Sequence, residues 1–225
     1  MKKGLAIALI MTLVIGAAFA AKGDIKVGAQ VGWGFDWMRM NKTQTILDHE
    51  YTGIEITKYN GLSAVLTGEY DITDAIGVKL EAGINLMGKQ KNISIWKKDG
   101  VVVSEEVVDD PDTTPMNYAF YLGGQYSFAV NKQIGITAGA GVDMMLGKQG
   151  SSDDEEVNGR IGVGLEAVGS YAVTDKISVT LGAKGSIYFF NTGEEFNYYK
   201  EKMQEIGWKY LQSGLKVFAG ATYKI

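Results

Sequence analysis

Hydrophobic residues alternate with small or polar residues along most of this chain. Eight segments show the alternation, at residues 25–37, 62–72, 76–86, 118–130, 134–146, 161–173, 177–189 and 211–225. Successive side chains of a β-strand point to opposite faces, whereas a helix repeats every 3.6 residues. The pattern therefore predicts eight strands, each with one apolar face and each long enough to cross a bilayer at a tilt.

The connections between these segments are alternately short and long. The short ones, at residues 72–75, 130–133 and 173–176, contain turn-forming residues and predict tight hairpins. The long ones fall near residues 38–60, 88–117, 147–158 and 190–208. Within the last, residues 194–206 suit either a short amphipathic helix or a continued hairpin. This order predicts an all-β, eight-stranded antiparallel up-and-down barrel.

The apolar face of each predicted strand is too large for the inside of such a barrel. It supplies about six or seven side chains per strand, and an eight-stranded barrel has little internal room. The opposite face is rich in glycine, of which the chain has 30, and glycine suits a narrow lumen. We therefore predict that the apolar face meets lipid, which makes the barrel transmembrane. The alternative is a soluble, lipocalin-like binder with the apolar face inside.

Aromatic residues on the apolar face gather near the two ends of the strands. Such rings prefer the membrane–water interfaces. We predict six interface aromatics, four at the end with the tight turns and two at the other: Tyr70, Tyr126, Tyr171, Tyr223, Trp33 and Trp37. An even strand count places the tight turns in the periplasm and the long loops outside the cell.

The first 20 residues have the features of a signal peptide, which leaves residues 21–225 for the barrel. Lys2 and Lys3 precede an apolar run, and Ala18-Phe19-Ala20 fits the cleavage pattern. The chain has no cysteine, which argues against a disulfide scaffold, a cysteine-based zinc site and a lipoprotein anchor. Its net charge of −4 and lack of a basic stripe argue against nucleic-acid binding.

Charged residues also occur on the face that should line the lumen. Four are expected at one level near the middle of the barrel, with two more below and above them: Glu81, Glu166, Lys184 and Lys216, then Lys79 and Arg160. A buried charge costs several kcal/mol unless it is paired. We therefore predict a lumen charge network that fills and neutralises the barrel. A gated ion path is the alternative, and a catalytic carboxylate pair would need an open cleft.

The whole arrangement resembles the small outer-membrane β-barrel family that includes the OmpA transmembrane domain, OmpX and Ail. Tyr223 matches an aromatic position in this family's C-terminal signal, whereas Ile225 replaces the usual terminal phenylalanine. The resemblance implies a monomer in the bacterial outer membrane, with outer-membrane lipids and the barrel assembly machinery as partners. OmpA-like members have a lumen charge network whose rearrangement is one proposed gate.

The sequence gives little support for catalysis. His49 is the only histidine and falls in a predicted loop, and the acidic runs at 105–112 and 153–156 lack the spacing of a calcium loop. We predict no catalytic, cofactor or metal site. The resemblance implies a structural or surface-interaction role, adhesin-like, through loops that contact an extracellular ligand or a host surface. The alternative is a narrow channel for ions or small solutes, gated by the lumen charges.

Overall fold

The computed structural model describes residues 23–88, 90–110, 116–149, 156–191, 204, 207 and 209–225. The predicted signal peptide and most of the connection at 192–208 lie outside these ranges. The described residues form ten antiparallel strands: β1 (Asp24–Ile46), β2 (His49–Asp71), β3 (Ile76–Met87), β4 (Gln90–Lys98), β5 (Val101–Asp110), β6 (Met116–Ala129), β7 (Ile134–Gln149), β8 (Glu156–Ala172), β9 (Ile177–Asn191) and β10 (Lys209–Lys224).

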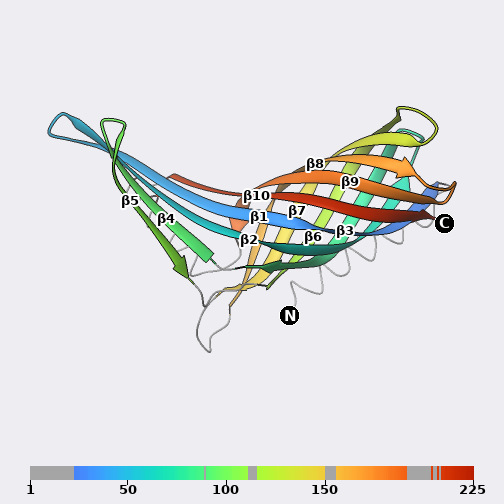
Figure 1. Ribbon diagram of the computed structural model, residues 1–225, viewed down its shortest axis with the longest axis horizontal. Helices are drawn as coiled ribbons and strands as arrows, with labels where there is room; N and C mark the ends of the chain where they lie inside the picture. Colours follow the sequence, from blue (N-terminus) through green and yellow to red (C-terminus); the bar gives the residue numbers. More distant parts are fainter. Residues whose placement is uncertain are drawn as a thin grey trace.

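Eight of these strands close into a ring, in the order β1-β2-β3-β6-β7-β8-β9-β10 (Figure 1). The ring closes because β1 pairs with β10 on one side and with β2 on the other. Neighbours in the ring are otherwise consecutive along the chain, apart from the inserted β4 and β5. This confirms the predicted up-and-down barrel, in which every strand has a hydrogen-bonding neighbour on both sides.

The apolar side chains of the ring point outward. Val31 is 60% exposed and Leu181 is 70% exposed. The opposite positions face the lumen and are closely packed, and Tyr121 there is only 1% exposed. This excess of apolar surface on the outside is stable only in lipid, so the soluble-binder alternative fails.

The three predicted tight turns all lie at the end of the ring where the chain ends. In the first, the Ile72 and Thr73 amides donate to the Ile76 carbonyl, at 2.8 and 3.0 Å. The Thr73 Oγ1 also accepts from the Ala75 and Ile76 amides. Asn131 and Thr174 accept the equivalent pairs of amides in the other two turns. A short polar side chain at the second turn residue therefore holds each hairpin.

The opposite end of the barrel differs from the prediction. The connections expected near 38–60 and 88–117 are largely strand, because β1 and β2 continue far beyond the ring and β4 and β5 form an added hairpin. β4 pairs with β2 from Tyr51↔Lys98 to Lys58↔Lys91. We call this four-stranded part, built from residues 38–46, 49–60, 90–98 and 101–110, the outer sheet (Figure 1). The alternation weakens there because no lipid-facing side selects for apolar residues.

No helix in the described part of the chain is long and apolar enough to span a membrane.

Candidate functional site

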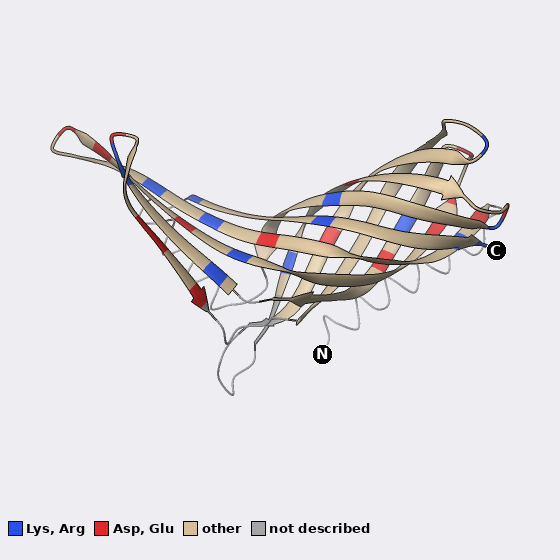
Figure 2. Ribbon diagram, in the orientation of Figure 1, with Lys and Arg blue, Asp and Glu red and all other residues tan. Residues whose placement is uncertain are grey.

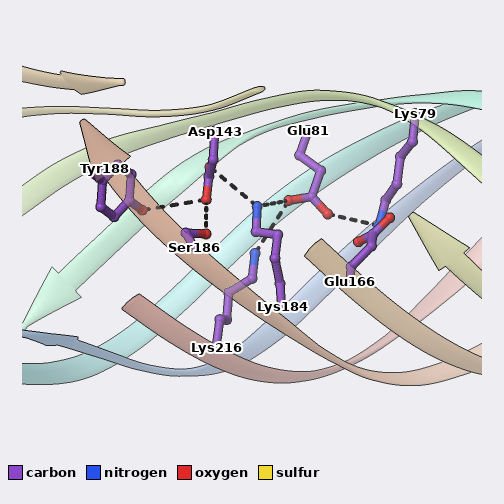
Figure 3. A network of polar contacts seen from close by, with 8 residues as sticks. All are labelled: Lys79, Glu81, Asp143, Glu166, Lys184, Ser186, Tyr188 and Lys216. Carbon is purple, nitrogen blue, oxygen red and sulfur yellow. Dashed lines mark hydrogen bonds and ion pairs between the residues drawn. The ribbon is translucent and has the colours of Figure 1, made fainter. Parts of the chain in front are cut away.

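A cluster of ion pairs occupies the lumen near the middle of the ring (Figure 3). The Lys79 Nζ lies 2.8 Å from the Glu81 Oε1 and 2.7 Å from the Glu166 Oε2. The Lys184 Nζ lies 2.8 Å from the Glu81 Oε2. These side chains come from β3, β8 and β9, and all four are buried. The strands on opposite sides of the barrel are therefore joined through its interior.

Two further residues extend this cluster toward β7 and β10. The Lys184 Nζ lies 3.5 Å from the Asp143 Oδ1, and the Lys216 Nζ lies 3.4 Å from the Glu81 Oε2. Ser186 and Tyr188 donate hydroxyl hydrogen bonds to the Asp143 carboxylate. We call the charged set the lumen network: Lys79, Glu81, Asp143, Glu166, Lys184 and Lys216 (Figure 3). Its three acids and three bases balance.

The strand register explains how these residues meet. Lys184 is the direct cross-strand neighbour of Glu166 on one side and of Lys216 on the other. Lys184 does not pair with either of these neighbours and instead reaches Glu81 and Asp143. Glu166 accepts its hydrogen bond from Lys79, which was expected below the network and belongs to it. The Glu81 carboxylate attracts three ammonium groups, so side-chain directions are set by charge across the lumen rather than by register alone.

Arg160 lies nearer the outer end, apart from the lumen network. Its guanidinium donates to the carboxylate of Asp36, which is buried on β1. Neither Asp36 nor Asp143 was predicted as a site residue. Both nevertheless sit on the lumen-facing parity of their strands. The same alternation that pointed to the other charges would have found them.

Aromatic rings and close backbone approach fill the space around the network. The Lys184 Nζ lies 4.5 Å from the centre of the Tyr121 ring, and the Lys216 Nζ lies 5.4 Å from the centre of the Phe218 ring. Both distances suit a cation–π contact. A Cβ added at Gly139 would lie 2.8 Å from the Glu166 Cγ, so a larger residue there would displace the Glu166 side chain. A cavity of about 30 Å³, lined partly by Asp143, Lys184 and Tyr188, remains beside the network.

Four of the six predicted interface aromatics fall at one end of the ring. The register places Tyr126 opposite Ile76, Tyr171 opposite Ile134 and Tyr223 opposite Ile177, at the end with the tight turns. Tyr70 lies at the same end, next to the first turn. Trp33 is exposed and Trp37 is half-buried, and both lie where β1 approaches the outer sheet. Their role as interface anchors stays a prediction.

The only histidine joins the two tips of the outer sheet. The His49 Nδ1 lies 2.7 Å from the Asp99 Oδ2, and the Glu50 amide donates to the Asp99 Oδ1 at 2.9 Å. The Asp99 amide in turn donates to the Glu50 carbonyl at 2.7 Å. The Glu50 amide and the His49 ring hold the pKa of the Asp99 carboxyl below its usual range. We call this contact the tip clasp. Among the described residues there is no group of three or more His, Cys, Asp or Glu that could hold a metal.

Apolar residues are also exposed on the outer sheet, beyond the lipid-facing part of the ring. Val101 is 67% exposed and Val103 is 59% exposed, and Val107 and Val108 on the same strand are also exposed. Among the described strands, β5 pairs only with β4 and forms the end of the sheet. Sequence reasoning did not single out these valines, because residues 88–117 were interpreted as a loop.

A closed ring of strands with an apolar outer face and a charged, packed interior defines an integral outer-membrane β-barrel. Residues 6–210 match the family described as "Outer membrane protein beta-barrel domain", and the chain belongs to this family. No curated protein sequence matches the chain.

Solved structures share this fold at low sequence identity. Neisserial surface protein A, NspA, is 15% identical with a TM-score of 0.54, over 89% of this chain and 97% of that one. Ail, the attachment invasion locus protein of Yersinia pestis, is 11% identical with a TM-score of 0.44, over 91% of this chain and 100% of that one. OprG of Pseudomonas aeruginosa is 14% identical with a TM-score of 0.44, over 90% of this chain and 96% of that one. The likeness to NspA shows the fold alone.

Proposed function

We propose that this protein binds an extracellular partner through its outer sheet, while the barrel anchors the sheet in the outer membrane. The observation that carries the proposal is the exposure of every valine of β5, on both faces of that strand: Val101, Val102, Val103, Val107 and Val108. Exposed apolar patches outside lipid commonly mark interaction sites. The outer sheet stands beyond the lipid-facing band, so lipid does not account for this apolar surface.

The position of β5 at the end of the sheet also supports a protein partner. On its open side the backbone N–H and C=O groups have no strand neighbour among the described residues. A sheet edge of this kind can pair with an extended segment of another chain. The acidic residues Glu105, Glu106 and Asp109 lie on the same strand. Two copies of β5 would therefore repel each other, which favours a different protein as the partner and agrees with a monomer.

The test separates binding from folding. Val101, Val103 and Val107 are replaced together by threonine, which keeps β-propensity and removes apolar surface. We expect the variant to keep the heat-dependent gel shift of a folded barrel. We also expect cells that display it to lose most of their adhesion to immobilised matrix proteins or host cells. The matched control is the same change to threonine at three exposed apolar residues of the tight-turn end, Val130, Val173 and Ile177. Equal adhesion by the valine variant and the wild type would overturn the proposal.

A narrow channel is the second candidate, and the cavity beside the lumen network favours it. That cavity has room for about two water molecules. The balanced ion pairs and the rings of Tyr121 and Phe218 argue against a channel, because they fill the same section of the lumen. We infer that the network acts as a plug and that Arg160 with Asp36 closes the lumen nearer the outside.

We further propose that the protein is not an enzyme. The carboxylates that could act as acid and base, such as Glu81 and Glu166, are buried in ion pairs with lysines. Acid–base chemistry on a substrate needs access to such groups.

We also propose that the barrel assembly machinery assembles this protein. Tyr223 supports this, because it lies in the last strand at an aromatic position of the family's C-terminal signal.

A further inference from the structure

The turn that joins β1 to β2 holds a leucine in a conformation that leucine rarely adopts. Leu47 has a φ of 49° and Asp48 has a φ of 66°. A two-residue hairpin turn with positive φ at both positions favours Asn, Asp or Gly, because a larger side chain crowds the backbone there. The β4–β5 turn meets this demand with Asp99 and Gly100. The β1–β2 turn does not, and its backbone is strained at Leu47.

Packing within the protein does not explain why leucine stands at this position. The Leu47 side chain is 89% exposed, so it adds little to the stability of the sheet. Strained backbone conformations of this kind gather at sites that act on other molecules. Because the strain costs stability and the exposed side chain returns none, we expect Leu47 to serve a contact outside the chain.

The tip clasp presents Leu47 together with a second exposed apolar side chain. The contacts of Asp99 with His49 and Glu50 join the two turns at the far end of the outer sheet (Figure 1). Leu47 of one hairpin and Val101 of the other are both exposed at this end. A side chain held on a fixed turn loses little conformational entropy when it binds. The clasp therefore prepares this end of the sheet for a contact.

Acidic side chains accompany Leu47 at the turn. Asp48 follows it directly, Glu50 lies three residues further along the chain, and both are exposed. Within the part of the chain that the structure describes, neither carboxylate forms an ion pair. Figure 2 shows acidic residues at the ends of both hairpins. A surface that receives Leu47 is complementary to this turn when basic side chains surround the point of contact.

These features favour a pocket in a protein over a lipid bilayer. A single myristoyl chain gives only marginal binding to a bilayer, and a leucine side chain is far smaller. Asp48 and Glu50 would also meet the phosphate groups of the lipid head groups, which carry the same sign of charge. A protein pocket can enclose one leucine and supply basic residues at its rim.

We propose that Leu47 inserts into an apolar pocket of the extracellular partner, and that lysine or arginine residues at the rim of this pocket pair with Asp48 and Glu50. This inference rests on the proposed binding through the outer sheet and names the residue at its centre. Leu47 lies about 30 Å along the chain beyond Trp37, at ~3.3 Å per residue, so it can reach a partner above the membrane.

The test uses Leu47→Asn in the full protein, embedded in lipid nanodiscs, because asparagine tolerates positive φ and lacks the apolar side chain. We expect half-saturation of the immobilised matrix proteins to need about 10- to 30-fold more of this variant, as the loss of a buried leucine predicts. We also expect the amides of residues 45–50 to exchange with solvent hydrogen about fivefold more slowly, because the strain is relieved. Leu47→Met keeps an apolar side chain and should bind like the wild type.

The acidic residues are tested with the double variant Asp48→Asn with Glu50→Gln. We expect it to associate with the matrix proteins about 3- to 10-fold more slowly than the wild type at low salt, and with a weaker dependence on salt. The matched control is Asp74→Asn with Asp175→Asn, which removes two exposed acidic residues from the tight-turn end and should associate at the wild-type rate. Equal rates in the tip variant and the wild type would overturn the basic rim.

Four results would overturn the proposal, and they separate it from the proposed function. Binding by Leu47→Asn at the wild-type level, while the valine variant of β5 loses binding, would leave the proposed function and remove Leu47 from it. An equal loss in Leu47→Met and Leu47→Asn would show that apolar surface is not the cause. Binding to phosphatidylcholine vesicles that depends on Leu47 would assign the turn to lipid. A wild type that binds no matrix protein would overturn both proposals.

Discussion

Glu81 is the centre of the charge arrangement inside the barrel. Its carboxylate lies within 2.8 Å of the Lys79 and Lys184 ammonium groups and 3.4 Å from that of Lys216. All of these side chains are largely shielded from solvent, so each charge depends on its partners. The sequence placed Glu81 on the lumen face two residues from Lys79, but its partners Lys184 and Lys216 follow from the closed ring, which brings β3 opposite β9 and β10.

Replacing Glu81 by glutamine leaves an excess positive charge in the lumen. Breaking a buried pair in this way costs about 3–5 kcal/mol. We expect a loss of this size in the free energy of unfolding, measured by urea titration of the protein refolded into lipid vesicles. The double variant Glu81→Gln with Lys216→Gln restores the balance and should regain part of the loss. A decrease of less than about 1 kcal/mol in the free energy of unfolding of the single variant would show that water, and not Glu81, stabilises the charges of the lysines.

The hairpins of the outer sheet are held together at their tips. The β1–β2 turn contains Leu47 and Asp48, both with positive φ, and the β4–β5 turn contains Asp99 and Gly100, also with positive φ. Asp and Gly tolerate this conformation, whereas leucine adopts it at a cost. The tip clasp through Asp99 joins the two turns and holds β4 in register on β2. The sequence offered no sign of this contact, because His49 and Asp99 are distant in the chain.

The tip clasp should depend on pH. Hydrogen bonding to the charged carboxylate lowers the pKa of Asp99 in the folded state. Its contribution is therefore present above the ordinary carboxyl pKa of 3.8 and is lost as the pH falls below that value. We expect the Glu50 amide, after correction for intrinsic rates, to exchange faster with solvent hydrogen at about pH 3 than at about pH 5.

Asp99→Asn is the control for this experiment, since it keeps an acceptor oxygen and removes the charge. Its Glu50 amide should exchange at a rate that does not change over the same pH range. The same pH response in the variant and the wild type would place the titrating group elsewhere. The barrel itself should be unaffected, because Asp99 contacts β2 at His49 and Glu50, which lie in the outer sheet beyond the ring.

The whole molecule combines a barrel, whose lumen holds the charged network, with an extended sheet outside it. The eight ring strands cross the membrane, and the continuation of β1 and β2 supports β4 and β5 (Figure 1). Closing the ring confines the charges of the lumen network to the interior, while β5 of the outer sheet is exposed along residues 101–109. The two parts can therefore serve different purposes, the first as anchor and the second as contact surface.

We expect the folded protein to show no steady single-channel conductance in a planar bilayer, because the lumen network and the Tyr121 and Phe218 rings fill its middle section. The Lys184→Gln variant, with Lys132→Gln as a control outside the lumen, tests the plug. Steady openings of the wild type that change in Lys184→Gln alone would instead favour the channel.

Much of the fold could be predicted because alternation is a local property. Val163, Leu165 and Ala167 sit on one face of β8 whatever the rest of the chain does, and the tight turn at 173–176 depends only on nearby residues. Lumen-facing charges such as Glu166 and Lys184 could be recognised in the same way. The outer sheet could not, since strands beyond the lipid-facing band need no apolar face and lose the alternation that identifies them.

The amino-acid pattern alone was enough to give the strands of the ring, their apolar outward face, the tight turns and the charged lumen, because each depends on residues close together in the sequence. The pairing of Glu81 with Lys184, of Asp36 with Arg160 and of His49 with Asp99 required the folded chain. Contacts between distant segments depend on how the ring closes and on the register of its strands. Each charged side chain then pairs with an opposite charge among the neighbours that ring closure brings close to it.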